Sequence, residues 1–401
     1  MTGTPLHLGL ALDGAGWHPA AWREPTARPR ELFSLRYWTE LIRSAADAGF
    51  DLVTIEDVFG LQGDGEPNSH EVRGRLDALL IASAVAPNVP GIGLVPSVTT
   101  THTEPFHVGT ATASLDYASE GWAGWRVKTS ALPHEAANLG RRPAPAVDIA
   151  AFLAGEPEQL RIVEEFFAEA GDVIEVVRRL WDSWEDDAVI RDVATGRYLD
   201  RDKLHYVDFD GERFSVTGPS ITPRPPQGQP PVYLLAHQRI PFELAVAQAD
   251  IVGITPADDA DLERIRAELA AIGGRVTRRV PQPLAVWTEA VVLIEDEPGA
   301  AAAELLRLDA QAGASLASDA VMLAGTSAEI AERLLEWHAA GVDGVRLRPA
   351  RLPLDLDRLA VGVLPLLRAA GLLERPAGAD SLRSRLGWNR PANRYAAEAV
   401  R

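Results

Sequence analysis

Polar side chains that could contact a ligand gather in one part of the chain, residues 91–130. Three consecutive threonines at positions 99–101 follow an apolar, β-branched stretch at 92–98, which the pattern predicts as a strand buried on both faces. After a helical stretch, residues 122–128 are typical of a second strand. In such a strand–helix–strand unit, a ligand binds at the carboxyl ends of the strands, where these hydroxyls lie. The alternative is a polar turn that only caps the helix.

The second strand of this unit carries two cations. Arg126 and Lys128 alternate with Trp125 and Val127 along the chain. Because successive side chains of a strand point to opposite faces, the two cations share one face and the two apolar residues share the other.

Two further cations occupy the predicted last strand, where Arg346 and Arg348 also share one face. Buried cations need partners, and Glu56 and Asp57 at the end of an earlier predicted strand are the candidates. The alternative is that all these cations point outward and lie near the surface.

Composition excludes several classes of protein. The chain has 401 residues, 46% of them hydrophobic, and a net charge of −18, which argues against nucleic acid and anionic membranes as partners. It contains no cysteine, so disulfides, thiolate catalysis and cysteine–zinc sites are excluded, and no metal site is expected. The N-terminal stretch lacks a basic region, and no apolar run reaches the roughly 18 residues of a membrane span. We therefore expect a cytoplasmic protein without a membrane segment.

Strand-like and helix-like stretches alternate along the chain. Helical patterns occur at residues 33–48, 76–86, 157–183, 262–272 and 359–370. This repeated alternation predicts a parallel sheet, and the number of units indicates a (β/α)8 TIM barrel, with the chemistry at the carboxyl ends of its strands. The predicted strands are residues 6–12, 50–57, 92–98, 122–128, 232–236, 249–252, 284–294 and 342–347.

Residues 91–130 resemble the core signature of the flavin-dependent, bacterial luciferase-like monooxygenases. The nearest branch contains the nitrilotriacetate, EDTA and dibenzothiophene-sulfone monooxygenases, and reads S-T-T-x-x-E-P-[YF]-H, then A-T-L-D-x-x-S-G-G-R-A-G-W-N-x-V-T-S. Two more stretches, 180–188 and 382–395, resemble the branch's L-W-D-S-W-E-D-D-A and its C-terminal L-R-x-R-L-x-x-x-R-P-A-N-x-Y. The matching residues of the core signature are Thr100, Thr101, Glu104, Pro105, Phe106, His107, Ala113, Leu115, Asp116, Ser119, Gly121, Ala123, Gly124, Trp125, Thr129 and Ser130.

The resemblance implies an oxygenase. Such an enzyme uses reduced FMN (FMNH2), supplied by a separate reductase, and O2 to form a flavin C4a-(hydro)peroxide that oxygenates a small organic substrate. The protein supplies a dry pocket and orientation, and the flavin performs the oxygen chemistry. The resemblance also implies a homodimer or homotetramer.

Site residues follow from the same resemblance and from their places at the predicted strand ends and loops. No catalytic residue is identified. The candidate cofactor-binding residues are Asp57, Thr100, Thr101, Arg126, Gln238 and Arg239. The candidate substrate-binding residues are Trp17, His18, Lys128, His237 and Arg346.

Several family flavin contacts are changed. Val163 and Phe167 stand where the family has a His and a Tyr near the flavin, and neither side chain can donate a hydrogen bond. Arg126 replaces an Asn, and the turn at 237–241 replaces the Gly-Ser-Ser that binds the flavin phosphate. The cations of the two strands therefore bind an anionic substrate or a relocated phosphate, or form salt bridges that fill a flavin site that no longer works.

Three functions remain open. The first is the FMNH2-dependent monooxygenase. The second is a coenzyme F420 (deazaflavin)-dependent oxidoreductase of the same superfamily, whose anionic cofactor tail would suit the arginines. The third is a diverged member without a redox cofactor, which would act as a binding or accessory protein.

The whole chain, residues 1–401, is expected to form a single luciferase-like barrel domain. Insertions are expected at about 131–160 and 185–218, and a C-terminal tail at 376–401. Within the first insertion, residues 132–154 are rich in Pro and Ala with little periodicity, which is typical of a long functional loop.

Overall fold

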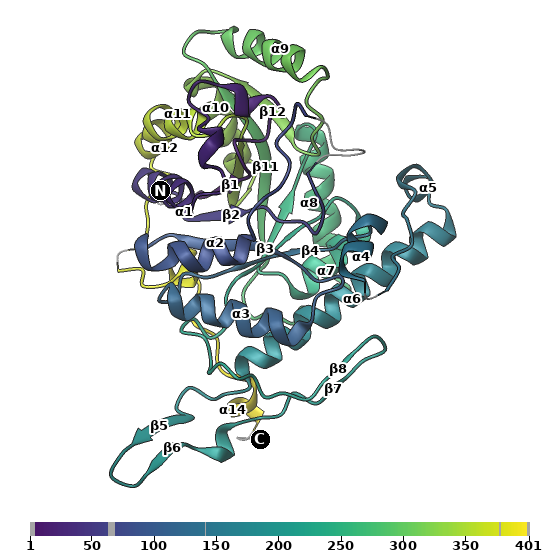
Figure 1. Ribbon diagram of the computed structural model, residues 1–401, viewed down its shortest axis with the longest axis vertical. Helices are drawn as coiled ribbons and strands as arrows, with labels where there is room; N and C mark the ends of the chain where they lie inside the picture. The colour runs from purple at the N-terminus through teal and green to yellow at the C-terminus, as the bar shows by residue number, and fades with distance from the viewer. Residues whose placement is uncertain (1–4, 63–68, 141, 377, 399–401) are drawn as a thin grey trace.

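A computed structural model describes residues 5–62, 69–140, 142–376 and 378–398. Residues 1–4, 63–68, 141, 377 and 399–401 lie outside these ranges. Nine parallel strands form one sheet, and the additional pairing of β10 with β11 closes it into a barrel surrounded by helices (Figure 1). The strands are β1 (His7–Leu12), β2 (Leu52–Ile55), β3 (Gly93–Thr99), β4 (Trp125–Lys128), β9 (Val232–Leu235), β10 (Ile251–Ile254), β11 (Ala285–Ile294), β12 (Val321–Gly325) and β13 (Gly344–Pro349).

The predicted (β/α)8 barrel is confirmed, since each predicted strand overlaps a strand of the closed barrel. The order around the barrel is β1, β2, β3, β4, β9, β10, β11, β13 and back to β1. The sequence pattern did not identify β12, which pairs only with the second half of β11, from Ala290 to Ile294.

Helices cover the outside of the barrel. Among them, α3 and α6 pack against each other, and the ring of Trp125 on β4 meets the ring of Trp181 on α6 edge-on, with centroids 6.4 Å apart. The helices are α1 (Leu35–Ala48), α2 (Ala78–Val85), α3 (Pro105–Ala118), α4 (Pro133–Leu139), α5 (Ile149–Leu153), α6 (Pro157–Asp182), α7 (Arg239–Gln248), α8 (Asp259–Gly273), α9 (Ala300–Ala312), α10 (Ser327–Ala339), α11 (Leu354–Arg358), α12 (Leu364–Ala369), α13 (Leu382–Arg385) and α14 (Arg394–Glu398).

The predicted long loop at 132–154 is partly wrong. It contains the short helices α4 and α5, whose first turns begin at Pro133 and after the N-cap Asp148, a residue whose carboxylate accepts from the Ala151 N–H. Each helix is too short to display a clear apolar period, so the pattern did not reveal it.

Two antiparallel hairpins leave the barrel after α6. They are β5 (Val189–Asp192) with β6 (Arg197–Leu199), and β7 (Phe209–Asp210) with β8 (Ser215–Val216). In Figure 1 both lie on the side of the molecule where the C-terminus lies. The second hairpin packs on α6, because Phe209 and Val216 join an apolar cluster with Val176 and Leu180 of that helix. Both hairpins lie within residues 185–218, where an insertion was expected.

The C-terminal tail closes the amino-terminal end of the barrel. Leu382 of α13 is fully buried and packs in one apolar cluster with Leu52, Val95 and Trp287, which come from three barrel strands. The tail therefore completes the lower core of the barrel.

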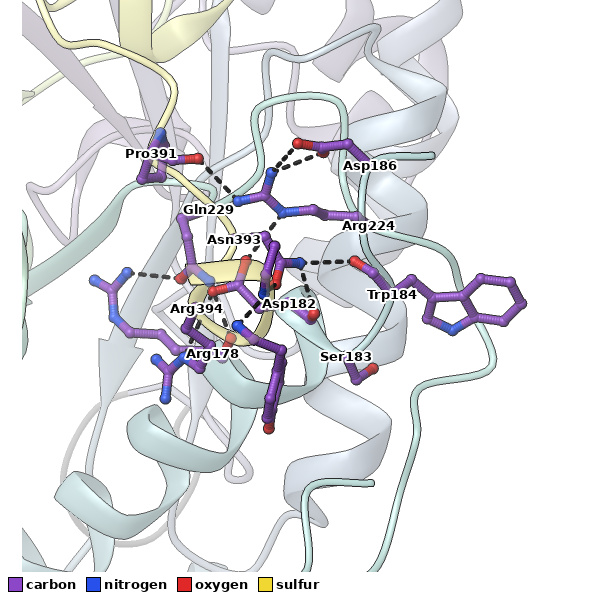
Figure 2. Close-up of polar contacts among 12 residues, drawn as sticks. Arg178, Asp182, Ser183, Trp184, Asp186, Arg224, Gln229, Pro391, Asn393 and Arg394 are labelled. Carbon is purple, nitrogen blue, oxygen red and sulfur yellow. Dashed lines mark hydrogen bonds and ion pairs between the residues drawn. The ribbon is translucent and has the colours of Figure 1, made fainter. Parts of the chain in front are cut away.

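Hydrogen bonds join the same tail to the end of α6 (Figure 2). The Asn393 amide donates to the carbonyls of Asp182 (2.7 Å) and Trp184 (2.9 Å). Arg224 donates to the Asp182 carboxylate (3.0 Å) and to the carbonyl of Pro391 (2.9 Å). Two sequence motifs singled out above, at 180–188 and 382–395, thus bind each other, which gives them a structural role away from the barrel mouth.

Candidate functional site

Polar side chains follow the strands at the carboxyl end of the barrel. Because the strands are parallel, their carboxyl ends meet at one mouth. The groups at this rim are, in barrel order, Asp13, Glu56, Thr99, Lys128, His237, Thr255 and Arg348.

Below the rim, the barrel interior holds an ion network. Arg346 donates to Glu289, to Glu56 and, through Nε, to the Thr54 hydroxyl at 2.7 Å. Arg348 donates through Nε to Glu289 at 2.8 Å and through Nη1 to Asp319 at 2.5 Å. Both arginines lie on one face of β13, as their alternation predicted. This face points inward, so the outward alternative is wrong.

Arg126 joins this network from β4. Its Nη1 donates to Glu56 and to the Ser97 hydroxyl, both at 3.0 Å. The Trp125 and Val127 side chains point the other way and belong to the main core. The shared face of Arg126 and Lys128 is therefore confirmed, and the structure directs it into the barrel. Of the two predicted acidic partners, Glu56 is the correct one.

Electrostatic effects fix the charges of the network. Burial alone would raise the pKa of Glu56, but the guanidiniums of Arg126 and Arg346 outweigh it and lower that pKa to about 2. Burial also opposes ionisation of Glu289, and Arg346 and Arg348 likewise bring its pKa well below the usual range. These carboxylates are therefore ionised and each balances more than one guanidinium.

Asp57 was predicted as a possible carboxylate partner of the cations, and this prediction is wrong for the described residues. Only its backbone carbonyl accepts a hydrogen bond from one of them, Lys128, at 3.1 Å. The Asp57 carboxylate accepts from the N–H groups of Val58 and Ala78, both at 2.8 Å, and so holds the start of α2 beside the end of β2. Burial raises the pKa of this carboxyl, and the bond from Ala78 opposes the rise. Asp57 also lines a cavity of about 160 Å³ with Ser97, Thr99 and other residues of β3 and α3.

The two predicted threonine contacts are hydrogen-bonded within the mouth. The Thr100 hydroxyl donates to the carbonyl of Lys128 at 3.0 Å, and the Thr101 hydroxyl accepts from the Ser130 N–H at 3.0 Å. Both side chains are buried. They join the end of β3 to the end of β4, and this pairing positions Lys128 at the rim.

Trp17 and His18 lie in the loop after β1 but face different surroundings. The Trp17 ring covers Arg346 and Arg348, with each guanidinium carbon 5.8 Å from the ring centroid. His18 is almost fully buried; its Nδ1 accepts from the Ala20 N–H, and Nε2 lies 3.1 Å from Asp309 of α9. Trp17 therefore faces the network, whereas His18, expected to contact substrate, holds the loop against α9.

The turn predicted at 237–241 is shorter than expected. The helix α7 begins at Arg239, so only His237 and Gln238 precede it. His237 Nδ1 lies 2.9 Å from the Thr255 hydroxyl and Nε2 lies 3.4 Å from Asp319, while burial lowers the pKa of the imidazole. Arg239 is half-exposed and pairs with Glu243 of its own helix at 3.2 Å.

Val163 and Phe167 lie on α6 as expected. Val163 is buried and Phe167 packs against the main core. The neighbouring face of α6 lines a different cavity of about 200 Å³, whose walls include His102, Phe166 and Glu169. Within the described ranges, the two positions give the mouth no hydrogen-bond donor.

The sequence predicted Glu56 as a partner of the cations but did not reveal the other two carboxylates of the network, Glu289 and Asp319. Glu289 is fully buried on β11, and Asp319 lies in the connection between α9 and β12. The only sequence signal for Glu289 was a carboxylate within the apolar run 285–294, which is unusual for a buried strand. Tyr233 of β9 also binds it, with its hydroxyl donating to Glu289 at 2.8 Å.

Comparisons with known proteins agree on one family. A family model described as luciferase-like monooxygenase matches residues 15–344. N-acetyl-S-(2-succino)cysteine monooxygenase of Bacillus subtilis (strain 168) and nitrilotriacetate monooxygenase component A of Aminobacter aminovorans are each 27% identical to this chain, with 98% of both proteins covered. The structure of EDTA monooxygenase from Chelativorans sp. BNC1 superposes with a TM-score of 0.79 at 24% identity, covering 96% of this chain and 99% of that one. The predicted resemblance of this chain to the luciferase-like monooxygenases is confirmed.

In the described part of the chain, no helix combines the length and apolar character that a membrane span needs. No group of three or more His, Cys, Asp or Glu side chains is arranged there to hold a metal ion.

Proposed function

Because the chain belongs to the luciferase-like monooxygenase family, we propose that it is a flavin-dependent monooxygenase that takes reduced FMN from a separate reductase and oxygenates a small organic substrate. The observation that carries this proposal is the match over nearly the full length to named monooxygenases. One of these is named as a component A, which supports a second, reductase component for this chain as well. A homodimer or homotetramer remains a separate prediction.

The residues at the mouth fit a flavin mononucleotide at two places. Arg239 and the first turn of α7, whose N-cap Gln238 makes no side-chain capping bond, offer a cation and backbone N–H groups to a phosphate. Arg239 can leave its exposed partner Glu243, because such surface pairs are weak. The cavity beside Asp57 and Thr99 offers polar groups and apolar walls to a ring.

The flavin, when bound, supplies the reaction with oxygen. The protein's part is to bind, orient and exclude water. Trp17 covers the network from the β1 loop, and His237 closes the side of β9 by its contacts with Thr255 and Asp319. The ion network holds charged side chains in fixed positions beneath the mouth, so the polar groups at the base of the site are preorganised.

The reason for considering coenzyme F420 is weakened by the ion network. Arg346 and Arg348 were expected to suit an anionic cofactor tail, but their guanidinium groups already bind Glu56, Glu289 and Asp319. Reduced FMN is therefore the cofactor that we propose.

The test is an anaerobic titration of the purified protein with reduced FMN, followed by isothermal calorimetry with oxidised FMN and with reduced F420. We expect saturable binding of reduced FMN, and weaker binding by an Arg239→Gln variant that loses the phosphate contact. An exposed arginine on α8, Arg264, supplies the matched control Arg264→Gln, which should bind as the wild type does. Binding of F420 alone, or of neither cofactor by a folded protein, would overturn the proposal.

A further inference from the structure

A second cavity of interest lies at the amino-terminal end of the barrel, opposite the mouth. Its volume is about 350 Å³, against about 160 Å³ for the cavity beside Asp57. Its walls come from the starts of β1, β11 and β13 and from the C-terminal tail. Because the chemistry of such barrels takes place at the carboxyl ends of the strands, this amino-terminal cavity is separate from the proposed catalytic site.

Most of the wall of the amino-terminal cavity is apolar. Cavities of about 300–1,000 Å³ with apolar walls and a few polar groups are typical of small-molecule sites. The Trp388 ring lies under the Arg383 guanidinium, whose carbon is 5.6 Å from the ring centroid, and packs on the apolar cluster that contains Leu386. It therefore offers a fixed, flat surface to a ligand. The other apolar lining residues include Pro5, Pro283, Leu284 and Pro376.

His7 lines the cavity and is only 7% exposed. Its ring stacks on that of Trp287, with centroids 6.2 Å apart, which fixes its orientation. Nδ1 is enclosed, has no hydrogen-bond partner and lies 3.5 Å from the Asp51 carboxylate. Nε2 makes no hydrogen bond to a described residue and is not enclosed, so a molecule in the cavity can reach it. Because buried polar groups nearly always have a partner, this imidazole is positioned for a ligand.

Arg385, at the end of α13, lines the same cavity. Its guanidinium makes no hydrogen bond to any residue that the structure describes. Nε is enclosed, but Nη1 and Nη2 are not, and 20% of the side chain is accessible. Nη1 is 3.8 Å from the carboxylate of Asp51, which Arg375 already approaches to 2.6 Å. The two Nη groups are therefore open donors in the wall of the cavity.

Asp343 gives the cavity an acceptor. It precedes β13, and its Oδ2 accepts from the Val286 N–H at 2.8 Å, whereas Oδ1 has no hydrogen bond to a described residue. The titratable lining residues are thus one cation, one carboxylate and one imidazole. Asp51 and Arg375 are not lining residues, and they pair with each other. The wall therefore offers donors and acceptors together.

This combination disfavours a charged ligand. An anion would be repelled by Asp343 and a cation by Arg385, whereas an uncharged molecule with both a carbonyl and an N–H group can satisfy the two residues at once. The carbonyl accepts from the guanidinium and the N–H donates to the carboxylate. A further polar group can reach His7 Nε2, which donates or accepts according to its tautomer. A planar ring also packs well on an indole such as that of Trp388.

We propose that the amino-terminal cavity binds a small, uncharged, planar nitrogen heterocycle that carries ring N–H and carbonyl groups, the class to which uracil belongs. The site lies away from the mouth, so the inference goes beyond the proposed function and does not depend on it. Because the wall joins the starts of three strands to the C-terminal tail, a bound ligand stabilises the folded barrel against unfolding.

The test titrates uracil into the full-length protein by calorimetry, with 1,3-dimethyluracil as a probe that keeps the ring and both carbonyls but has no N–H. We expect saturable binding of uracil and at least tenfold weaker binding of 1,3-dimethyluracil. Asp343→Asn keeps an acceptor for the Val286 N–H but replaces the free oxygen by a donor, so it should weaken uracil binding at least tenfold. His7→Phe keeps a ring on Trp287 without the nitrogens and should weaken uracil binding severalfold.

Arg264→Gln, on the exposed face of α8, is the matched control and should bind uracil as the wild type does. Thermal unfolding shows whether each variant is folded, and uracil should raise the Tm of the wild type more than that of Asp343→Asn. His7→Phe keeps the test valid if Asp343→Asn does not fold.

Three results would overturn the inference: no uracil binding by the folded wild-type protein, equal affinity for the two probes, or an affinity that is unchanged in both variants. Loss of uracil binding in the presence of saturating reduced FMN would overturn it as well, because the heterocycle would then occupy the mouth. Uracil binding that depends on His7 and Asp343 in a protein that binds no FMN supports this inference and counts only against the proposed function.

Discussion

Arg346 and Glu289 face each other inside the barrel, on the neighbouring strands β13 and β11, and both side chains are completely excluded from solvent. Glu289 also binds Arg348 and the Tyr233 hydroxyl. An isolated buried ion would be very unfavourable, so each member of this group is tolerated only because the others are present. The polar interior of the barrel therefore folds as one unit.

Removing the Glu289 charge should destabilise the protein strongly. The Glu289→Gln variant keeps the side-chain volume but leaves Arg346 and Arg348 short of a buried carboxylate. Breaking a buried pair in this way costs about 3–5 kcal/mol of unfolding free energy. Urea denaturation followed by circular dichroism measures the difference.

Glu268→Gln is the matched control, because Glu268 forms an i,i+4 pair with Arg264 on the exposed side of α8. Its effect should stay below about 1 kcal/mol. Equal stabilities of the two variants would show that the interior network contributes nothing beyond a surface pair.

Acid should weaken the network in a defined pH window. The pKa of Glu56 is lowered from 4.5 to about 2, mainly because the attraction of Arg126 and Arg346 exceeds the effect of burial. A carboxyl group with a depressed folded-state pKa stabilises the protein fully above its unfolded pKa and loses that contribution as pH falls toward the folded one. The free energy of unfolding should therefore fall as the pH is lowered from 4.5 toward 2.

Urea unfolding at a series of pH values tests this with the Glu56→Gln variant. The variant should be less stable than the wild type at pH 7, and the two stability curves should approach each other in acid. A constant difference across the window would contradict the assigned ionisation of Glu56.

The strands of the barrel were predictable because most are largely apolar runs that are buried on both faces, and because strand-like and helix-like stretches alternate along the chain. The elements in the connections between the strands were harder to predict. The short helices α4 and α5 have too few turns to show a period, and β12 pairs along only half of β11. Where tertiary contacts rather than local pattern form an element, the sequence alone gives a weak signal.

For the site, alternation along β4 correctly placed Arg126 and Lys128 on one shared face, which the structure directs into the barrel. It could not identify Glu289, because the register that brings Arg346 beside Glu289 is set by strands separated in the chain by α9, β12 and α10. The hydrogen bonds of Asp57, Thr100 and His18 to other parts of the protein could not be predicted either. A sequence motif specifies residue types, but it does not specify the partners that the loops bring close to them.

The C-terminal tail should contribute to barrel stability. Leu382 is fully buried against Leu52 and Trp287, so Leu382→Ala leaves a cavity at the lower end of the barrel. Such truncations cost about 2–5 kcal/mol of unfolding free energy. Leu366→Ala on the half-exposed face of α12 serves as control, and differential scanning calorimetry should show a much smaller decrease in its Tm; equal decreases would contradict the role of the tail.

Asn393 should hold the tail to α6. In Asn393→Ala the carbonyls of Asp182 and Trp184 lose their side-chain donor, which costs about 1–3 kcal/mol when such groups stay buried. Hydrogen exchange should then become faster in residues 390–398. Asn138→Ala removes an exposed bond to the Phe59 carbonyl and should leave the tail unaffected; unchanged exchange in both variants would mean that other contacts fix the tail.

Trp17 should stabilise the arginines beneath it. Its ring lies 5.8 Å from the guanidinium carbons of both Arg346 and Arg348, at a partly buried position where cation–π attraction contributes about 0.5–2 kcal/mol. Trp17→Ala removes this attraction and opens the network to water, whereas Trp17→Phe retains a smaller aromatic face. We therefore expect the free energy of urea unfolding to decrease in the order wild type, Trp17→Phe, Trp17→Ala. Equal stability of all three would mean that the ring merely lies over the arginines, and that other contacts hold the β1 loop in place, such as the contact of His18 with Asp309.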